Sequence, residues 1–209
     1  MILEHIKKQY GINKPIFTED ILNMFPDYSR AYVFRLIKKI EEDKELIKFS
    51  QGVYYIPRKT SFGLSTITAD YVVEKRYIYS DKDVFGIYSG LKLLNQFSVT
   101  SQVPNVIEII TNNEATRKRE INIDGRKFIL RKSRFRIDKN NVNEYRVLQL
   151  FSDIKSPEEL DVFSKQRLIE YINDKRISKN NLLSLAVKFP TKTIKNLIES
   201  GVLNEIAWE

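Results

Sequence analysis

Two acidic segments have the residue types and spacing that could support metal chemistry: Asp27 after Pro26, and Glu42-Asp43-Lys44. An acid pair followed by a lysine resembles the metal-binding residues of some nucleases, which lie on adjacent strands. Here both segments fall at the ends of one predicted helix, where acidic residues are typical solvated helix termini. A magnesium site made only of carboxylates is the open alternative.

Other catalytic arrangements find little support in the sequence. The only histidine, His5, lies among apolar residues of a predicted helix, where a packed or solvated imidazole is expected. The sequence contains none of the glycine-rich phosphate-binding motifs and no H-E-x-x-H motif. Without cysteine it has no thiolate nucleophile or metal ligand. We therefore predict that the protein is not an enzyme, with no catalytic residue, no metal site and no cofactor.

The charge of the chain indicates a polyanionic partner. The 209 residues include 35 Lys and Arg against 27 Asp and Glu, which gives a net charge of +8. The excess lies in residues 1–59 and 106–140, whereas the other segments are balanced.

No apolar run approaches the roughly 18 residues of a membrane span, the absence of cysteine fits a reducing compartment, and the amino terminus does not resemble a signal peptide. We expect a cytoplasmic protein without membrane contact.

Residues 1–59 show the pattern of a winged helix-turn-helix DNA-binding domain. Apolar spacing predicts a helix over 2–10, a short helix capped by Thr18, and a third helix from Asp27 or Ser29 to Glu42. Two β-rich runs joined across Gly52 then predict a hairpin. In this fold the third helix enters the major groove and the hairpin, or wing, touches the backbone. The expected DNA contacts are Tyr32, Arg35 and Lys39 on the exposed helix face, Arg30 and Lys38 beside them, and Lys48 and Gln51 in the wing.

Residues 60–209 predict a second, α+β domain with a helical carboxy-terminal tail. Its pattern indicates a helix over 67–79, another over 88–97 and a buried strand over 106–111. Asp124-Gly125 predicts a tight hairpin between two strands within 119–132. The tail over 141–209 has balanced charge and the pattern of a small helical bundle, with expected helices at 164–175, 179–188 and 191–199.

The hairpin segment 106–140 carries a cluster of cations suited to phosphate groups. In Arg134-Phe135-Arg136-Ile137, strand alternation places both arginines on one face. Arginine offers a planar, permanently charged fork to phosphate oxygens. The alternative is that these cations only protect an exposed sheet edge. The candidate phosphate-binding residues are Arg117, Lys118, Arg119, Arg126, Lys127, Arg131, Lys132, Arg134 and Arg136.

Four strings follow one another along the chain: GVYYIPR (52–58), FGLSTITADYVVEKRYI (62–78), GIYSGLKLLNQFSVTSQVPNVIEIITN (86–112) and REINIDGRKFILRKS (119–133). In pattern and in order they resemble the AbiEi family, the antitoxins of type IV toxin-antitoxin systems that act in abortive infection against phage. The resemblance covers roughly residues 1–137.

The resemblance implies a winged-helix autorepressor that binds inverted repeats in its own promoter, often cooperatively. It also implies a second domain that counteracts a cognate nucleotidyltransferase toxin without forming a stable complex with it, and it fits a chain that is monomeric in solution. Two alternatives stay open. One is an RNA-binding module that acts on the RNA target of the toxin, and the other is a stand-alone transcriptional regulator without antitoxin activity.

Overall fold

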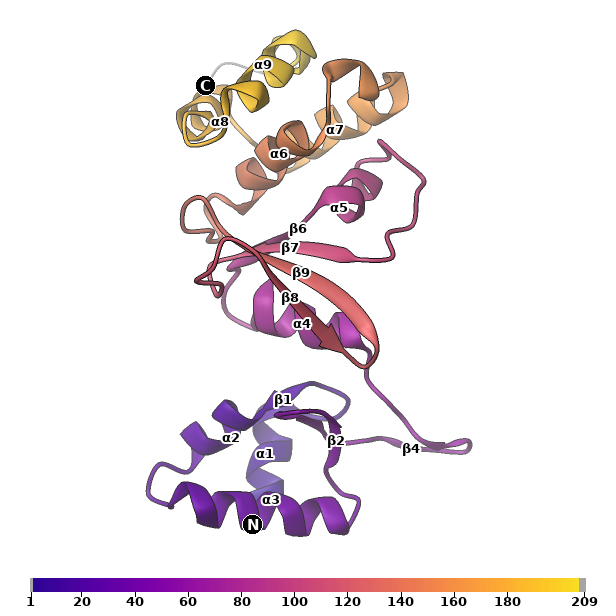
Figure 1. Ribbon diagram of the computed structural model, residues 1–209, viewed down its shortest axis with the longest axis vertical. Helices are drawn as coiled ribbons and strands as arrows, with labels where there is room; N and C mark the ends of the chain where they lie inside the picture. Colours follow the sequence, from indigo (N-terminus) through magenta and orange to yellow (C-terminus); the bar gives the residue numbers. More distant parts are fainter. Residues whose placement is uncertain (1, 207–209) are drawn as a thin grey trace. The chain divides into compact units, whose positions relative to one another are not determined.

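The computed structural model describes the chain from residue 2 to residue 206, and its fold class is α+β (Figure 1). Contacts divide it into two compact units. The N-terminal unit extends to Lys75 and includes Ile123–Gly125, and the C-terminal unit holds Arg76–Asn122 and the chain from Arg126 onward. The division falls within a helix, later in the chain than the domain start expected at residue 60. No helix within residues 2–206 has both the length and the apolar character needed to cross a membrane.

The N-terminal unit is built from three helices, a three-stranded sheet and a second small hairpin. The sheet has the antiparallel order β1-β3-β2, and a core of Ile6, Ile16, Ile21, Val33 and Ile37 lies between the helices and the sheet. The elements of this unit are α1 (Ile2–Tyr10), β1 (Ile16–Phe17), α2 (Thr18–Met24), α3 (Arg30–Glu42), β2 (Ile47–Ser50), β3 (Val53–Tyr55), β4 (Lys59–Thr60) and β5 (Gly63–Leu64).

The expected helix and hairpin positions in this unit agree with the structure, with one local correction. Thr18 was expected to cap the second helix, but the N-cap of α2 is Phe17. The Phe17 N–H donates to the side chain of Asp20, the third residue of α2, at 3.1 Å, so this acid satisfies the backbone N–H of the N-cap residue.

The C-terminal unit places helices on a four-stranded sheet of order β6-β7-β9-β8. Strand β7 pairs antiparallel with β6 and parallel with β9. Helices α5 and α6 lie over one face of this sheet, and α7, α8 and α9 surround α6 farther out (Figure 1). The elements are α4 (Ala69–Tyr77), which begins in the N-terminal unit, β6 (Gly86–Ser89), α5 (Gly90–Gln96), β7 (Ile107–Thr111), β8 (Arg119–Ile123), β9 (Arg126–Lys132), α6 (Val142–Asp153), α7 (Val162–Asp174), α8 (Lys179–Ala186) and α9 (Thr191–Glu199), with short 3-10 turns at Pro157–Glu159 and Val202–Asn204.

One large core joins the sheet to the helical tail. Ile87 and Ile110 contribute from the sheet, Tyr145 and Phe151 from α6, and Leu168 from α7, and all are at most 5% exposed. Because α6 is buried along most of its length, it forms the centre of this unit. The tail is therefore part of the same packed body as the sheet.

Two predictions for this unit were wrong in detail. The helix expected over 88–97 is present as α5 but begins two residues later, at Gly90, because residues 88 and 89 belong to strand β6. The run from Arg134 to Ile137 is not a strand, because β9 ends at Lys132 and the chain then bends. The two arginines of that run are nevertheless exposed, and Ile137 is buried, as the alternation predicted.

Candidate functional site

Helix α3 carries an exposed surface that is both aromatic and basic. Ser29 begins the helix, and its hydroxyl accepts the Tyr32 N–H at 3.3 Å. Val33 and Ile37 anchor the opposite face, with 1% and 2% exposure. Because they fix the rotation of the helix, the residues predicted to face DNA are all exposed: Arg30, Tyr32, Arg35, Lys38 and Lys39.

Tyr32 is held in place by its neighbours. Its ring stacks on that of Tyr28 with 5.1 Å between centroids. The guanidinium carbon of Arg35 lies 5.8 Å from the centroid of the same ring. A side chain restrained in this way loses less conformational entropy when it meets a partner.

The hairpin β2–β3 presents the two predicted wing residues to solvent. Lys48 lies opposite Tyr54 in the register and is exposed, and Gln51 is exposed in the turn. Gly52 follows with φ of 70°, a conformation that glycine adopts at little cost. The register shifts between Lys48 and Ser50, which bends the strand that carries Lys48.

The nine cations predicted around β8 and β9 are all exposed, but they are not equivalent. Arg119 donates through Nε to Glu114 at 2.7 Å, and Arg131 lies 2.8 Å from Glu108. Lys118 lies 3.2 Å from the exposed Glu120. A cation already paired with a carboxylate gives up that interaction when it binds phosphate. Arg119 and Arg131 are therefore weaker candidates for phosphate contacts than the sequence alone indicates.

The carboxylate of Glu114 fixes the position of the Arg119 side chain. Only 5% of Glu114 is exposed, and its carboxylate accepts hydrogen bonds from the N–H and hydroxyl of Thr116 as well as from Arg119. Burial by itself would raise the pKa of this carboxyl, but the hydrogen bonds outweigh it and lower the pKa to about 2. The pair therefore fixes the start of β8.

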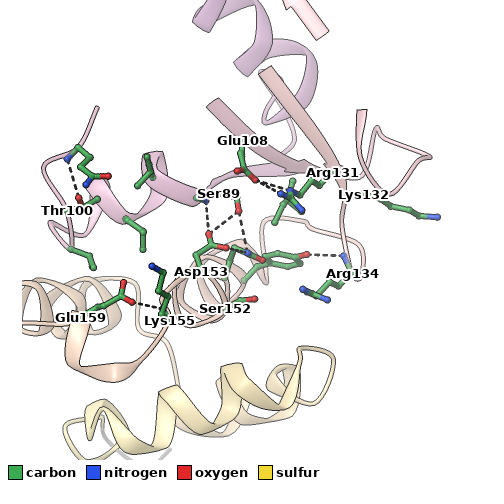
Figure 2. Close-up of a pocket in the computed structure, with 18 of the residues that line it drawn as sticks. Ser89, Thr100, Glu108, Arg131, Lys132, Arg134, Ser152, Asp153, Lys155 and Glu159 are labelled. Atoms are coloured by element: carbon green, nitrogen blue, oxygen red, sulfur yellow. Dashed lines mark hydrogen bonds and ion pairs between the residues drawn. The ribbon is translucent and has the colours of Figure 1, made fainter. Parts of the chain in front are cut away.

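Four of the predicted cations meet at one pocket of the C-terminal unit, with a cavity of about 800 Å³. They are Arg117, Arg131, Lys132 and Arg134, and Lys155 adds a fifth cation from the far side (Figure 2). Lys155 follows α6 and was not predicted. Its position beside the hairpin depends on the packing of α6 against the sheet, which the local pattern does not reveal.

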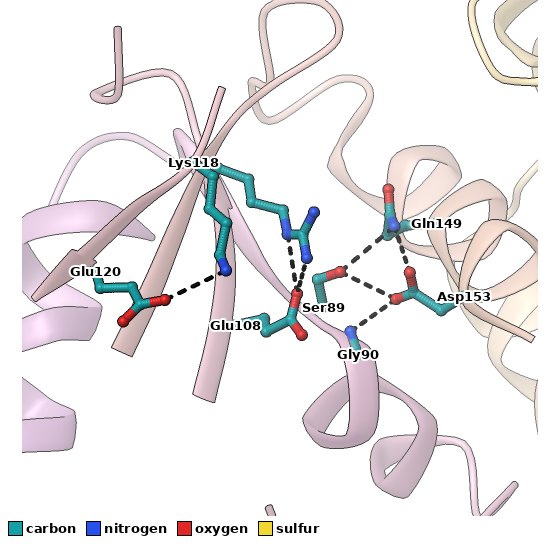
Figure 3. Close-up of polar contacts among 8 residues, drawn as sticks. Ser89, Gly90, Glu108, Lys118, Glu120, Gln149 and Asp153 are labelled. Carbon is teal, nitrogen blue, oxygen red and sulfur yellow. Dashed lines mark hydrogen bonds and ion pairs between the residues drawn. The ribbon is translucent and has the colours of Figure 1, made fainter. Parts of the chain in front are cut away.

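A polar network at the base of the pocket was also missed by the sequence analysis. Asp153 accepts hydrogen bonds from the Ser89 hydroxyl at 3.0 Å, from the Gly90 N–H at 2.7 Å and from the Gln149 amide at 2.7 Å (Figure 3). Burial raises the pKa of Asp153, and these three donors oppose the shift. The network ties the junction of β6 and α5 to α6.

The residues that could have supported catalysis are placed apart. Asp27 precedes α3 and Glu42 ends it, and a 13-residue helix is about 20 Å long, so the two acids cannot share a metal ion. Within residues 2–206 no three His, Asp or Glu side chains are grouped to hold a metal. Ser89 is 3% exposed, and its hydroxyl donates to the Asp153 carboxylate.

A scan against models of known protein families and a search of curated proteins each returned no match to this chain.

Proposed function

We propose that the N-terminal unit is a winged helix-turn-helix that binds double-stranded DNA, and that the chain is a transcriptional autorepressor. The observation that carries this proposal is the exposed face of α3, which presents Tyr32, Arg35 and Lys39 opposite the buried Val33 and Ile37. An α-helix fits the major groove of B-DNA, where arginine and lysine recognise the acceptors of guanine.

The order of elements supports the same interpretation. Helices α2 and α3 are followed directly by the hairpin β2–β3, and the hairpin pairs with β1 in one sheet. In a winged helix the recognition helix reads the bases while the hairpin contacts the backbone. Lys48 and Gln51 are exposed where such contacts would form. Base contacts from α3 would then determine which sequence is bound, and backbone contacts from the wing would fix the orientation of the domain on the DNA.

The antitoxin role is a further part of the proposal and rests on the resemblance of residues 1–137 to AbiEi antitoxins. In this role the chain binds inverted repeats in its own promoter and counteracts a nucleotidyltransferase toxin in abortive infection. The C-terminal unit is then the part that opposes the toxin. Co-expression with the neighbouring toxin tests this directly: rescue of growth supports the antitoxin role, and failure with intact DNA binding leaves a stand-alone regulator.

The RNA-binding alternative receives less support from the hairpin segment. Sequence-specific recognition of RNA commonly stacks bases on exposed aromatic rings. Phe128 is 1% exposed, and Phe135 packs against Tyr145 with 4.7 Å between ring centroids. Neither ring is free to serve as a stacking platform.

The test of DNA binding is a gel shift with the upstream DNA of the gene, in the presence of random duplex and structured RNA as competitors. The variant Arg35→Glu/Lys39→Glu is expected to lose sequence-selective binding while its melting temperature stays within about 2 °C of the parent, because both side chains are exposed. Two successive complexes would support binding to paired half-sites.

The matched control is Lys7→Glu/Lys8→Glu, which makes the same change of charge on exposed residues of α1 in the same unit. It is expected to weaken binding only through the general loss of positive charge. Equal losses in the two variants would contradict the assignment of α3 as the recognition helix. Preferential competition by RNA would favour the alternative.

A further inference from the structure

We propose that the basic pocket of the C-terminal unit binds a nucleoside di- or triphosphate. The proposal concerns a small ligand and does not depend on DNA binding by α3. It rests on the charge, the volume and the lining residues of the pocket (Figure 2).

The positive charge in the pocket is available to a ligand. Within the described residues, no ion pair involves Arg117, Lys132 or Lys155, although all three line the cavity. The guanidinium of Arg134 lies 5.3 Å from the centroid of the Phe189 ring and likewise has no carboxylate partner. Four cations are therefore free to meet phosphate oxygens.

The acidic residues of the pocket are already engaged. Glu108 binds Arg131 through two contacts of 2.8 and 2.9 Å. Asp153 accepts three hydrogen bonds, and Glu159 accepts the backbone N–H of Lys155 at 2.8 Å. Only Glu108 is neutralised by a cation; neutral donors leave the charges of Asp153 and Glu159 in place, and the five cations that line the pocket still outnumber its three carboxylates.

The opposite wall suits an uncharged, largely apolar group. Leu91 and Leu94 of α5 and Val99 after it line this side, beside the hydroxyl of Thr100 and the amide of Gln102. A ligand that satisfies both walls has an anionic end and a flat apolar end. A nucleotide combines these features, whereas inorganic phosphate fills only the cationic side.

Gln149 supplies an unused hydrogen-bond acceptor at this site. It lines the pocket, is 4% exposed, and donates through its amide nitrogen to Asp153 and to Ser89. Its Oε1 has no hydrogen-bond partner and points away from both of those residues (Figure 3). A buried acceptor without a partner is costly, so this amide is the lining group of the pocket that the protein satisfies least.

The size of the cavity also favours a small ligand over duplex DNA. Its volume of about 800 Å³ lies within the range of small-molecule and cofactor sites. A DNA backbone presents a convex surface and would contact only the rim. The four cations inside the pocket are therefore better placed for a nucleotide than for flanking DNA.

The experiment is calorimetric titration of the full chain with ATP, GTP, CTP and UTP, and separately with pyrophosphate and with the nucleosides. At least one nucleoside triphosphate is expected to bind more tightly than pyrophosphate and than its own nucleoside. The variant Arg117→Gln/Lys132→Gln is expected to weaken that binding by about tenfold or more, because two charge-assisted contacts are lost. Both side chains are exposed, so the variant should fold.

The control is Lys127→Gln/Lys139→Gln, which removes the same charge from exposed residues outside the pocket and should change affinity by less than about twofold. Equal weakening by both variants would overturn the assignment of the pocket, as would no binding of any nucleotide at millimolar concentration. Pyrophosphate binding as tightly as the best nucleotide would overturn the nucleoside part of the proposal. The Arg35→Glu/Lys39→Glu variant should bind the nucleotide normally, which separates this proposal from that of DNA binding.

Discussion

Glu114 and Arg119 show how two charged side chains can be part of the structure instead of part of a binding surface. The Glu114 carboxylate is almost fully buried, while Arg119, its partner, has a side chain that is 47% exposed. From the sequence, Arg119 is one of several adjacent cations. Its ion pair with a buried acid can be recognised only when the turn between β7 and β8 is known. By contrast, Glu108, the partner of Arg131, has a side chain that is 30% exposed.

The lowered pKa of Glu114 predicts that the stability of the fold depends on pH. Its pKa is lowered from 4.5 to about 2 in the folded protein, so its stabilising contribution is complete above about pH 4.5 and is lost as the pH falls toward 2. The variant Glu114→Gln should lower the free energy of unfolding at pH 6 by roughly 1.5 to 3 kcal/mol, and by less at pH 3. Urea unfolding at the two pH values measures this difference.

Glu120→Gln is the matched control, because Glu120 is an exposed acid whose side chain is 70% accessible and pairs only with Lys118. Its effect should be below about 1 kcal/mol and nearly the same at both pH values. If Glu114→Gln behaved in the same way, the buried ion pair would not stabilise the fold.

At the scale of elements, local sequence signals predicted the third helix and both hairpins well. Ser29 and the apolar spacing define α3, and Asp124-Gly125 defines the turn between β8 and β9, where both residues have positive φ. Strand β6 could not be predicted in this way, because its four residues run without a break into α5. Its strand conformation comes from pairing with β7, which is a tertiary contact.

The backbone of β6 packs closely against its neighbours at Gly86. A Cβ atom at this position would collide with the carbonyl of Tyr77 and would lie 2.8 Å from the carbonyl oxygen of Ile110. Gly86→Ala is therefore expected to cost more than about 2 kcal/mol of stability. At Gly125, with φ of 77°, a Cβ atom meets nothing within 4 Å, so Gly125→Ala should cost only about 1 kcal/mol of backbone strain.

Denaturant unfolding of the two full-length variants distinguishes these costs. Gly86→Ala should have the lower midpoint, or fail to accumulate as folded protein while Gly125→Ala is recovered normally. A similar midpoint for both would mean that β6 accommodates a methyl group by moving away from Tyr77, contrary to the packing described above.

For the whole molecule, the basic segments identified in the sequence belong to different units with different chemistry. In the N-terminal unit the candidate DNA-binding cations lie on the exposed surface of α3, with Lys48 in the wing. In the C-terminal unit they divide between ion pairs, exposed positions on the hairpin and the walls of a pocket. The sequence predicted which residues are basic and exposed. It could not predict the pocket, because Ser89, Glu108, Arg131 and Asp153 come together only when the sheet and α6 are assembled.

Charge at this scale can be tested through the salt dependence of DNA binding. If Lys127, Arg136 and Lys139, which lie outside the pocket, contact flanking phosphates, replacing all three with Gln should reduce the slope of log affinity against log salt by about 0.9 for each contact removed. The control replaces three exposed lysines of the helical tail, Lys175, Lys192 and Lys195, and should leave the slope unchanged. Equal slopes for the two variants would mean that the hairpin cations do not contact DNA and contribute only to the general surface charge.

The parallel pairing of β7 with β9 has a consequence for protein synthesis. Strand β7 emerges from the ribosome with β6 already made, but its second partner begins only at Arg126, and α6, which buries the face of the sheet, follows later still. Until then the growing chain exposes an unpaired strand edge flanked by isoleucines, the kind of surface on which nascent chains associate. A premature stop codon between Thr111 and Arg126 would therefore not release the N-terminal elements alone. It would release the elements of the N-terminal unit fused to an unfinished, aggregation-prone sheet.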